Sequence, residues 1–548
     1  MASTWIHACH LLHEKCNKAS DGNPTRLLHI QGHGQSIKLV PTVPSQTYEY
    51  VALSHRWGEP KPASTLQGNI KDRMNGAAVQ DLPATFQDAV AVTSQLGYQY
   101  LWIDSLCIVQ DDETDWAQEC PRMSFIFQGA ALTIAAPAAK DSSVGFLHRR
   151  PLYENPDYKP CTLQYRSTKG RPISTIKIWY PGCHRGEKPI TSLPGISYSV
   201  LGTQPESVLD NRGWVLQETM LSSRTLYFGS CQMYFECKTL FQNESMHDGE
   251  NNPELSGPDG PGFFSDIMPF SRWTDFSWWH DFITNYSKRD LTVVTDRLPA
   301  ISGIIHACQP PLWETYLAGV WKSDIPEGLM WYISRERWMK LKKKAAGATC
   351  EPEYGSPAIV AQQNYVAPSW SWASVRHEVR FAPFSFHINV HIEVLSFSTT
   401  LVDSSLDADA YGRVKAGYLQ VRGKLCKAMV AQRSIKGGCF VWPLPFDETD
   451  QDPALLLPDD ISSFDSLPWT GPPVPILTNR QVKKNNFCEI YALKLGKISP
   501  LRGYALAIVP TDAACFRRVG LLRFDDHHSN RMLDRWFGRE EKQEITLV

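Results

Sequence analysis

The sequence predicts an α/β protein in which a parallel sheet with flanking helices is followed by a helical segment and a C-terminal antiparallel β-domain. Two observations carry this prediction. Between residues 48 and 137, short apolar runs alternate with segments of helical periodicity, and this alternation with short connections indicates crossover units and a parallel sheet. Beyond residue 375, strand-like runs follow one another, which is typical of a small antiparallel sandwich or barrel.

With 548 residues, the chain is long enough for more than one hydrophobic core. We therefore divide it into four parts: an N-terminal helical segment at residues 1–45, the α/β domain at 46–240 with an insertion at 151–210, a helical and linker region at 241–375, and a C-terminal β-rich domain at 376–548. The linker prediction rests on a stretch rich in Asn, Gly, Pro and Glu that includes GPDGPG.

Within the α/β domain, each predicted element has its own local signal. Aromatic and branched apolar runs predict strands at residues 48–54, 100–104 and 131–136. Apolar residues three and four positions apart predict helices at 85–96 and 114–127, and Gly97 stands where a C-terminal cap belongs.

Downstream of these elements, the insertion contains two β-prone segments, CTLQYR and STIKIWY. A helix begins near residue 211, and it places Trp214 and Glu218 on one face. Strands at 225–228 and 232–236 form a predicted hairpin that turns on Gly229-Ser230. Residues 273–306 then have a helical pattern.

Composition excludes several classes of function. The formal net charge of −2 gives no overall attraction to nucleic acid or to anionic membranes. No apolar run is long enough to span a bilayer, and the N-terminus has no secretory pattern. The fourteen cysteines are scattered, as expected of thiols in a reducing compartment. We therefore expect a cytoplasmic protein with no transmembrane segment and no nucleic-acid partner.

Three residues near the N-terminus have the spacing of metal ligands. Cys9, His13 and Cys16 lie at positions i, i+4 and i+7, which is one face of a helix. They could hold a zinc ion if a fourth ligand came from elsewhere in the chain. No second Cys/His pair of familiar spacing follows, so the sequence favours a packed helix face.

An ordered set of motifs resembles a known family. YVALSHRWG at residues 50–58, LPATFQDAVAVTSQLGYQYLWIDSLCIVQDD at 82–112 and RGWVLQETMLSSRTLYFG at 212–229 together are similar to the heterokaryon-incompatibility (HET) domain of filamentous fungi. This resemblance implies a fungal cytosolic protein that takes part in non-self recognition and programmed cell death.

The order of elements also has a remoter similarity to Toll/interleukin-1 receptor (TIR) domains, so the resemblance implies a TIR-like sheet. Some TIR domains cleave NAD. Carried over, the similarity implies that NAD is a substrate and that Glu218 is the catalytic acid. It places the following residues at the nucleotide: Ser54, Arg56, Trp57, Asp104 and Trp214. A carboxylate there could stabilise the oxocarbenium-like charge that develops when the nicotinamide–ribose bond breaks.

Each of these residues also has a purely structural interpretation. Asp104 could hydrogen-bond the following loop, Trp57 could be a core aromatic, and Glu218 could pair with an arginine. Three functions therefore stay open: a cell-death effector that signals by self-association through the HET domain, a TIR-like NAD glycohydrolase, and an unrelated biosynthetic or housekeeping role on the same scaffold.

Overall fold

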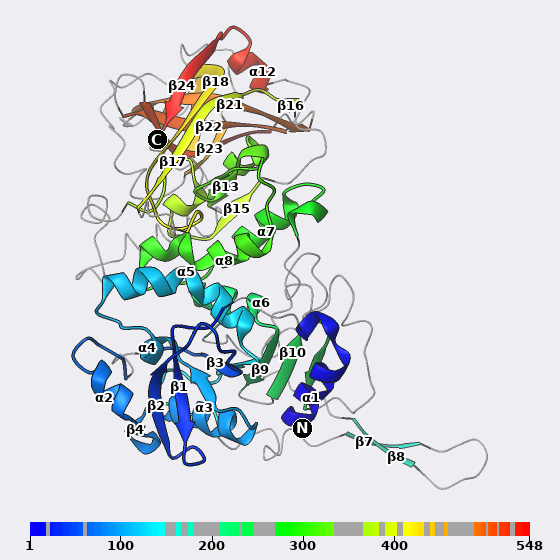
Figure 1. Cartoon of the computed structure of the whole chain (residues 1–548). Helices are drawn as coiled ribbons and strands as arrows, with labels where there is room; N and C mark the ends of the chain where they lie inside the picture. Colours follow the sequence, from blue (N-terminus) through cyan, green and yellow to red (C-terminus); the bar gives the residue numbers. More distant parts are fainter. Residues whose placement is uncertain are drawn as a thin grey trace, which may run out of the picture. The chain divides into compact units, whose positions relative to one another are not determined.

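The structure is a computed structural model of the chain (Figure 1). It describes residues 1–17, 22–58, 63–147, 161–165, 174–178, 209, 211–229, 233–244, 269–333, 365–382, 389–402, 409–431, 439–443, 454–458, 487–499, 502–511, 515–525 and 532–548. Contacts within the chain divide it into two compact units: Met1–Met268 with His306–Cys308, and Pro269–Ile305 with Gln309–Val548.

The first unit is built on a mixed sheet whose described strands run in the order β11-β10-β9-β6-β3-β5-β1-β2-β4. Its centre consists of four parallel strands: β9 (Arg224–Phe228), β6 (Leu132–Ala135), β3 (Tyr50–Ser54) and β5 (Tyr100–Trp102). All five residues of β3 are buried, as expected of a strand between two parallel neighbours. The predicted parallel sheet with its helices is confirmed.

Antiparallel strands extend this sheet on both sides. Strands β10 (Met233–Cys237) and β11 (Phe241–Asn243) follow β9. On the other side, β1 (Arg26–Gln31) pairs with β5, β2 (Ser36–Pro41) pairs with β1, and β4 (Ala77–Ala78) pairs with β2.

The prediction of a helical segment at residues 1–45 is therefore wrong for its second half. Only α1 (Ala2–Leu12) and the 3-10 helix η1 (Glu14–Asn17) are helical. Strands β1 and β2 form a hairpin whose turn includes Gly32, His33 and Gly34, all with positive φ. Turn residues that accept positive φ reverse the chain here, and its apolar side chains then complete the sheet.

The predicted helices of the α/β domain are present. Helix α3 (Ala84–Gln95) buries the predicted stripe, and Gly97 follows it with φ +90°. Helix α5 (Glu113–Gly129) begins after Asp112, whose carboxylate accepts hydrogen bonds from the amides of two residues in its first turn.

Helix α6 (Gly213–Leu221) precedes β9, as predicted. The β9–β10 hairpin pairs Phe228 with Met233. Ser230 of the predicted turn and Gln232, the predicted start of the second strand, lie outside the described residues. In the insertion, β7 (Cys161–Tyr165) and β8 (Ser174–Ile178) pair as an antiparallel hairpin.

The second unit begins with helices and ends in β-structure. The continuous helical pattern predicted at 273–306 is divided into α7 (Ser277–Tyr286) and α8 (Pro299–Ala307), with a 3-10 turn at Val294–Arg297 between them. Pro299 opens α8, because proline at the first helical position loses no hydrogen bond, whereas inside a helix it would.

The described strands of the C-terminal β-domain pair in antiparallel fashion except for one pair. Six of its strands form a closed ring of pairings in the order β18-β21-β22-β23-β20-β19. Their bounds are Val414–Ala431, Phe487–Ser499, Arg502–Pro510, Cys515–Asp525, Ala454–Pro458 and Cys439–Pro443. Strand β24 (Lys542–Leu547) pairs with β18 and runs parallel to β23. The predicted antiparallel domain is confirmed.

No helix in the described part of the chain is both long and apolar enough to span a bilayer.

Candidate functional site

Two parallel strands bring candidate residues to one edge of the first sheet. Ser54 is the last residue of β3, and Asp104 opens the short helix α4 (Asp104–Cys107) just after β5. The carboxyl ends of parallel strands lie at the same edge, which is where open α/β sheets bind ligands. We call Ser54, His55, Trp57, Asp104 and Arg212 the strand-end cluster.

Asp104 joins the two strand ends. Its Oδ2 accepts a hydrogen bond from the indole Nε1 of Trp57 at 2.8 Å, and its Oδ1 accepts one from the amide of Ser105 at 2.7 Å. The hydrogen bond from Ser105 is the local contact that we expected if Asp104 has a purely structural role. The hydrogen bond from Trp57 is a cross-strand contact, so Asp104 fixes the orientation of a residue 47 positions earlier in the chain.

His55, to which the sequence assigned no role, lies inside this cluster. Its side chain is buried, with Nδ1 3.9 Å from Oδ1 of Asp104 and its ring edge-on to Phe86. Burial lowers the pKa of His55 to about 4, even though Asp104 acts in the opposite direction. The imidazole is therefore neutral at neutral pH.

Three buried polar atoms of this region have no hydrogen-bond partner among the described residues. They are Oγ of Ser54, Nε2 of His55 and Oγ of Ser105, and all three residues are less than 5 % exposed. Native proteins satisfy nearly all such atoms because an unpaired buried polar group costs free energy. Their concentration beside Asp104 marks the strand ends as a place where polar groups of a small ligand would gain hydrogen bonds.

The turn after β3 has a defined backbone shape. Oγ of Ser142 donates to the carbonyl oxygens of Arg56 and Trp57, at 3.1 and 2.9 Å. Gly58 has φ +81°, and a Cβ there would lie 2.2 Å from Cβ of Asp141. Only glycine fits this position. The Arg56 side chain is exposed, so it is placed on the surface next to the cluster.

Helix α6 reaches the cluster through its N-terminal flank. Nη1 of Arg212, the residue before α6, donates to the carbonyl oxygen of His55 at 2.5 Å. Trp214 is partly buried against the core of the first unit, and Glu218 is buried. Glu218 follows Arg212 by six residues, or about 9 Å along a helix axis. The structure thus brings Ser54, Trp57 and Asp104 together, and the role of Glu218 stays a prediction.

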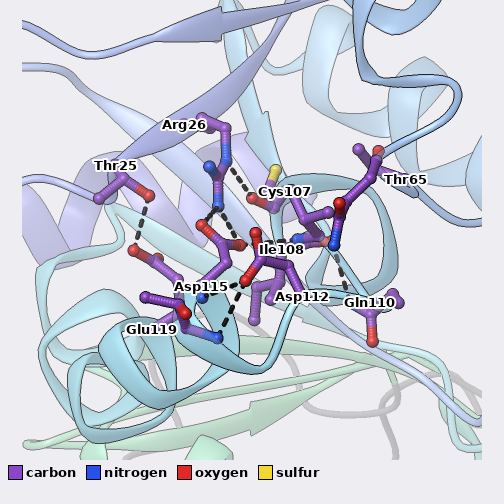
Figure 2. Close-up of polar contacts among 12 residues, drawn as sticks. Thr25, Arg26, Thr65, Cys107, Ile108, Gln110, Asp112, Asp115 and Glu119 are labelled. Carbon is purple, nitrogen blue, oxygen red and sulfur yellow. Dashed lines mark hydrogen bonds and ion pairs between the residues drawn. The ribbon is translucent and has the colours of Figure 1, made fainter.

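The loop between α4 and α5 is fixed by a separate polar network, drawn in Figure 2. Arg26 of β1 makes two hydrogen bonds to the Asp115 carboxylate, at 2.7 and 2.6 Å, and a third to the carbonyl oxygen of Cys107. Asp115 also accepts from the amide of Val109, and Thr25 donates to Glu119. These contacts hold α4 and α5 against β1, so Asp115 and Glu119 of α5 have structural partners.

The N-terminal metal candidates acquire a fourth neighbour. Ligand atoms of Cys9, His13, Cys16 and Cys237 all lie within 4.8 Å of one another. Cys237 ends β10 and lies 224 residues from His13, so no spacing pattern in the sequence could have revealed it.

Comparison with known families gives one match. Residues 50–218 match the family described as Heterokaryon incompatibility protein (HET). Comparisons with curated proteins and with solved structures give no match. The matched range begins in β3 and ends in α6, so every residue of the strand-end cluster, together with Trp214 and Glu218, lies within it.

Proposed function

Because residues 50–218 form a HET domain, we propose that this chain is a heterokaryon-incompatibility-type effector of a filamentous fungus, acting in non-self recognition and programmed cell death. The observation that carries the proposal is the family match, which includes the whole strand-end cluster. Within this proposal the cluster is the part of the domain on which the activity depends. Its Trp57–Asp104 hydrogen bond links the two strand ends.

We further propose that the effector acts in the cytoplasm and self-associates through its HET domain. Cys9, Cys16, Cys107 and Cys237 are all thiols in the structure, as is typical of a reducing compartment. Light scattering of the purified chain over a range of concentrations tests self-association, and a mass equal to one chain at every concentration would contradict it.

Induced expression in a filamentous fungal host tests the effector proposal. Wild-type chain should reduce the viability of the hyphae. Trp57→Phe keeps an aromatic ring but removes the donor to Asp104, so it should weaken the effect at equal protein level. Trp313→Phe is the matched control because Trp313 is 67 % exposed and lies in the second unit. Undiminished viability with wild-type protein would refute the proposal.

A second candidate function is hydrolysis of NAD. Buried polar atoms without partners at Ser54, His55 and Ser105 favour it, since a nucleotide offers many hydrogen-bonding groups. In this reaction the ribose–nicotinamide bond breaks, its electron pair goes to the nicotinamide nitrogen, and water supplies the new C–O bond and releases a proton. A carboxylate, here Glu218, would stabilise the positive charge on the ribose.

Release of nicotinamide from NAD by the purified full chain tests this second function. Glu218→Gln should abolish release because the amide has no negative charge. Glu113→Gln, on the exposed first turn of α5, is the matched control and should leave the rate unchanged. If NAD stays intact at high concentrations of assembled wild-type protein, the chain is not a glycohydrolase.

A further inference from the structure

Four potential metal ligands from two distant parts of the chain lie together in the first unit. Cys9 belongs to α1, His13 is its C-cap, Cys16 lies in η1, and Cys237 ends β10. One ligand atom from each lies within 4.8 Å of the other three, and the three cysteines are at most 3 % exposed.

The local backbone explains why the N-terminal three converge. The amide of His13 donates to the carbonyl oxygen of Cys9 at 3.0 Å, and the amide of Cys16 donates to that of His13 at 3.0 Å. One helical turn and one 3-10 turn therefore follow directly on each other. The three side chains consequently face the same point, but not as one helix face: α1 ends at Leu12, His13 is its C-cap, and Cys16 lies in η1.

Cys237 approaches from the turn between β10 and β11. The amide of Cys237 donates to the carbonyl oxygen of Leu240 at 2.9 Å, and the amide of Leu240 donates back to Sγ of Cys237 at 3.4 Å. Oγ1 of Thr239 lies 3.7 Å from Sγ of Cys16. The β10–β11 turn therefore brings Cys237 and Thr239 to the side chain of Cys16.

The separations fit a tetrahedral site. Nδ1 of His13 lies 3.4 Å from Sγ of Cys237. Zinc–sulfur bonds of about 2.3 Å and zinc–nitrogen bonds of about 2.0 Å at tetrahedral angles place such a pair about 3.5 Å apart. The cysteines are thiols in the structure, so no disulfide competes for these sulfur atoms.

The charge around the cluster is a second, independent observation. Arg224 at the start of β9 is only 4 % exposed, and its Nε lies 3.2 Å from Sγ of Cys9 while its Nη2 donates to Asn17. In the described part of the chain, no carboxylate forms an ion pair with it. A buried guanidinium requires a compensating negative charge. Three thiolates and one histidine around a divalent ion carry a net charge of −1, which Arg224 would balance.

We propose that Cys9, His13, Cys16 and Cys237 bind one Zn²⁺ ion in a structural site that fastens α1 and η1 to the β10–β11 hairpin. Three sulfur ligands and one nitrogen ligand in tetrahedral arrangement are typical of zinc. All four positions are filled by protein, so the ion has no open position for substrate and its role is structural. The site is separate from the strand-end cluster, and it does not depend on the proposed function.

Metal analysis of the full chain tests this proposal. Protein purified with reduced thiols and dialysed to remove loosely bound metal should contain about one zinc ion per chain by mass spectrometry. Cys237→Ser should lower the zinc content at least about tenfold under the same conditions, because it removes one of four ligands. Cys515→Ser, a partly exposed cysteine of the second unit, should leave it unchanged.

A ligand exchange keeps the test informative even if Cys237→Ser fails to fold. His13→Cys should keep the ion, and in the Co²⁺-substituted protein it should strengthen the thiolate-to-cobalt absorption band. Wild-type chain that takes up no zinc after reduction would overturn the proposal, as would a Cys237→Ser chain that keeps its zinc. An identical Co²⁺ spectrum for His13→Cys would overturn the assignment of His13.

Discussion

His55 shows how one buried side chain sets the electrostatics of the strand-end cluster. It lies between the Asp104 carboxylate, 3.9 Å from its Nδ1, and Phe86, whose ring closes one side. Desolvation outweighs the attraction to Asp104, so the pKa falls to about 4 and the ring is neutral. The cluster therefore contains a neutral imidazole at neutral pH.

This pKa shift predicts a pH dependence of stability. An unfolded histidine has a pKa of about 6.5, so between about pH 6.5 and about pH 4 the unfolded chain binds a proton that the folded chain does not. As the pH is lowered through that range, the free energy of unfolding should therefore decrease. When the pH is lowered from about 7.5 to about 5, the free energy of unfolding of the wild type should decrease by about 2 kcal/mol more than that of His55→Phe.

Urea unfolding of both chains at the two pH values measures this difference. Subtracting the variant removes the contributions of all other titrating groups, including Glu236, whose pKa burial raises to about 7. Equal changes in wild type and variant would show that His55 is protonated as easily in the folded chain as in the unfolded chain.

At the scale of elements, the Arg26–Asp115 pair joins β1 to α5 (Figure 2). Both side chains are mostly buried, at 13 % and 15 % exposure, so solvent screens the pair less than a surface ion pair. Arg26 also holds the carbonyl oxygen of Cys107, and Asp115 holds the amide of Val109. The pair therefore sets the position of α4, whose first residue is Asp104.

We expect the single variants Arg26→Met and Asp115→Asn each to lower the free energy of unfolding by about 2 kcal/mol, because each leaves a partly buried charge or acceptor without its partner. The double variant should cost less than the sum of the two. A double-mutant cycle by urea unfolding measures the coupling, and strictly additive costs would argue that the two side chains act independently.

At the scale of the whole molecule, each of the two units has its own hydrophobic core. The core of the first unit is centred on the parallel strands, and a core of the second lies within the C-terminal β-domain. Arg518 of β23 is buried in the second unit. Its guanidinium carbon Cζ lies 3.5 Å from the ring centroid of Trp331. The guanidinium donates hydrogen bonds to the carbonyl oxygens of Leu329 and Trp331.

We therefore expect two unfolding transitions in scanning calorimetry. Arg518→Met leaves two buried carbonyl oxygens without their donor, so it should lower the midpoint of one transition by several degrees. Arg26→Met should lower the midpoint of the other. A single transition that both variants shift together would show that the chain unfolds as one cooperative body.

The sequence predicted those parts of the fold whose signal is local. The alternation between residues 48 and 137 predicted the parallel strands and helices α3 and α5. Apolar periodicity and helix caps are set by residues close together in the chain, so a single sequence shows them. Pairings between distant segments leave no such signal. Leu28 of β1 pairs with Leu101 of β5, and no pattern in residues 1–45 indicates that β5 is the partner strand.

Contacts between distant segments also decided which parts of the candidate sites could be predicted. Ser54, Trp57 and Asp104 could be predicted to meet because they follow strands that the pattern makes parallel. The neutral state of His55 depends on burial, and Cys237 reaches the N-terminal ligands only through the pairing of β10. Both are properties of the tertiary structure.

The central claim is that the proposed effector activity depends on the strand-end cluster, and one comparison tests it most directly. Hyphal viability is measured after induction of wild type, Asp104→Ala and Asp111→Ala, at equal levels of folded protein. Asp111 is an exposed acid of the loop that follows α4, and its Oδ1 accepts a hydrogen bond from the amide of Gln67, outside the cluster. We predict that wild type and Asp111→Ala reduce viability and that Asp104→Ala does not. Equal loss of viability with Asp104→Ala would contradict the claim.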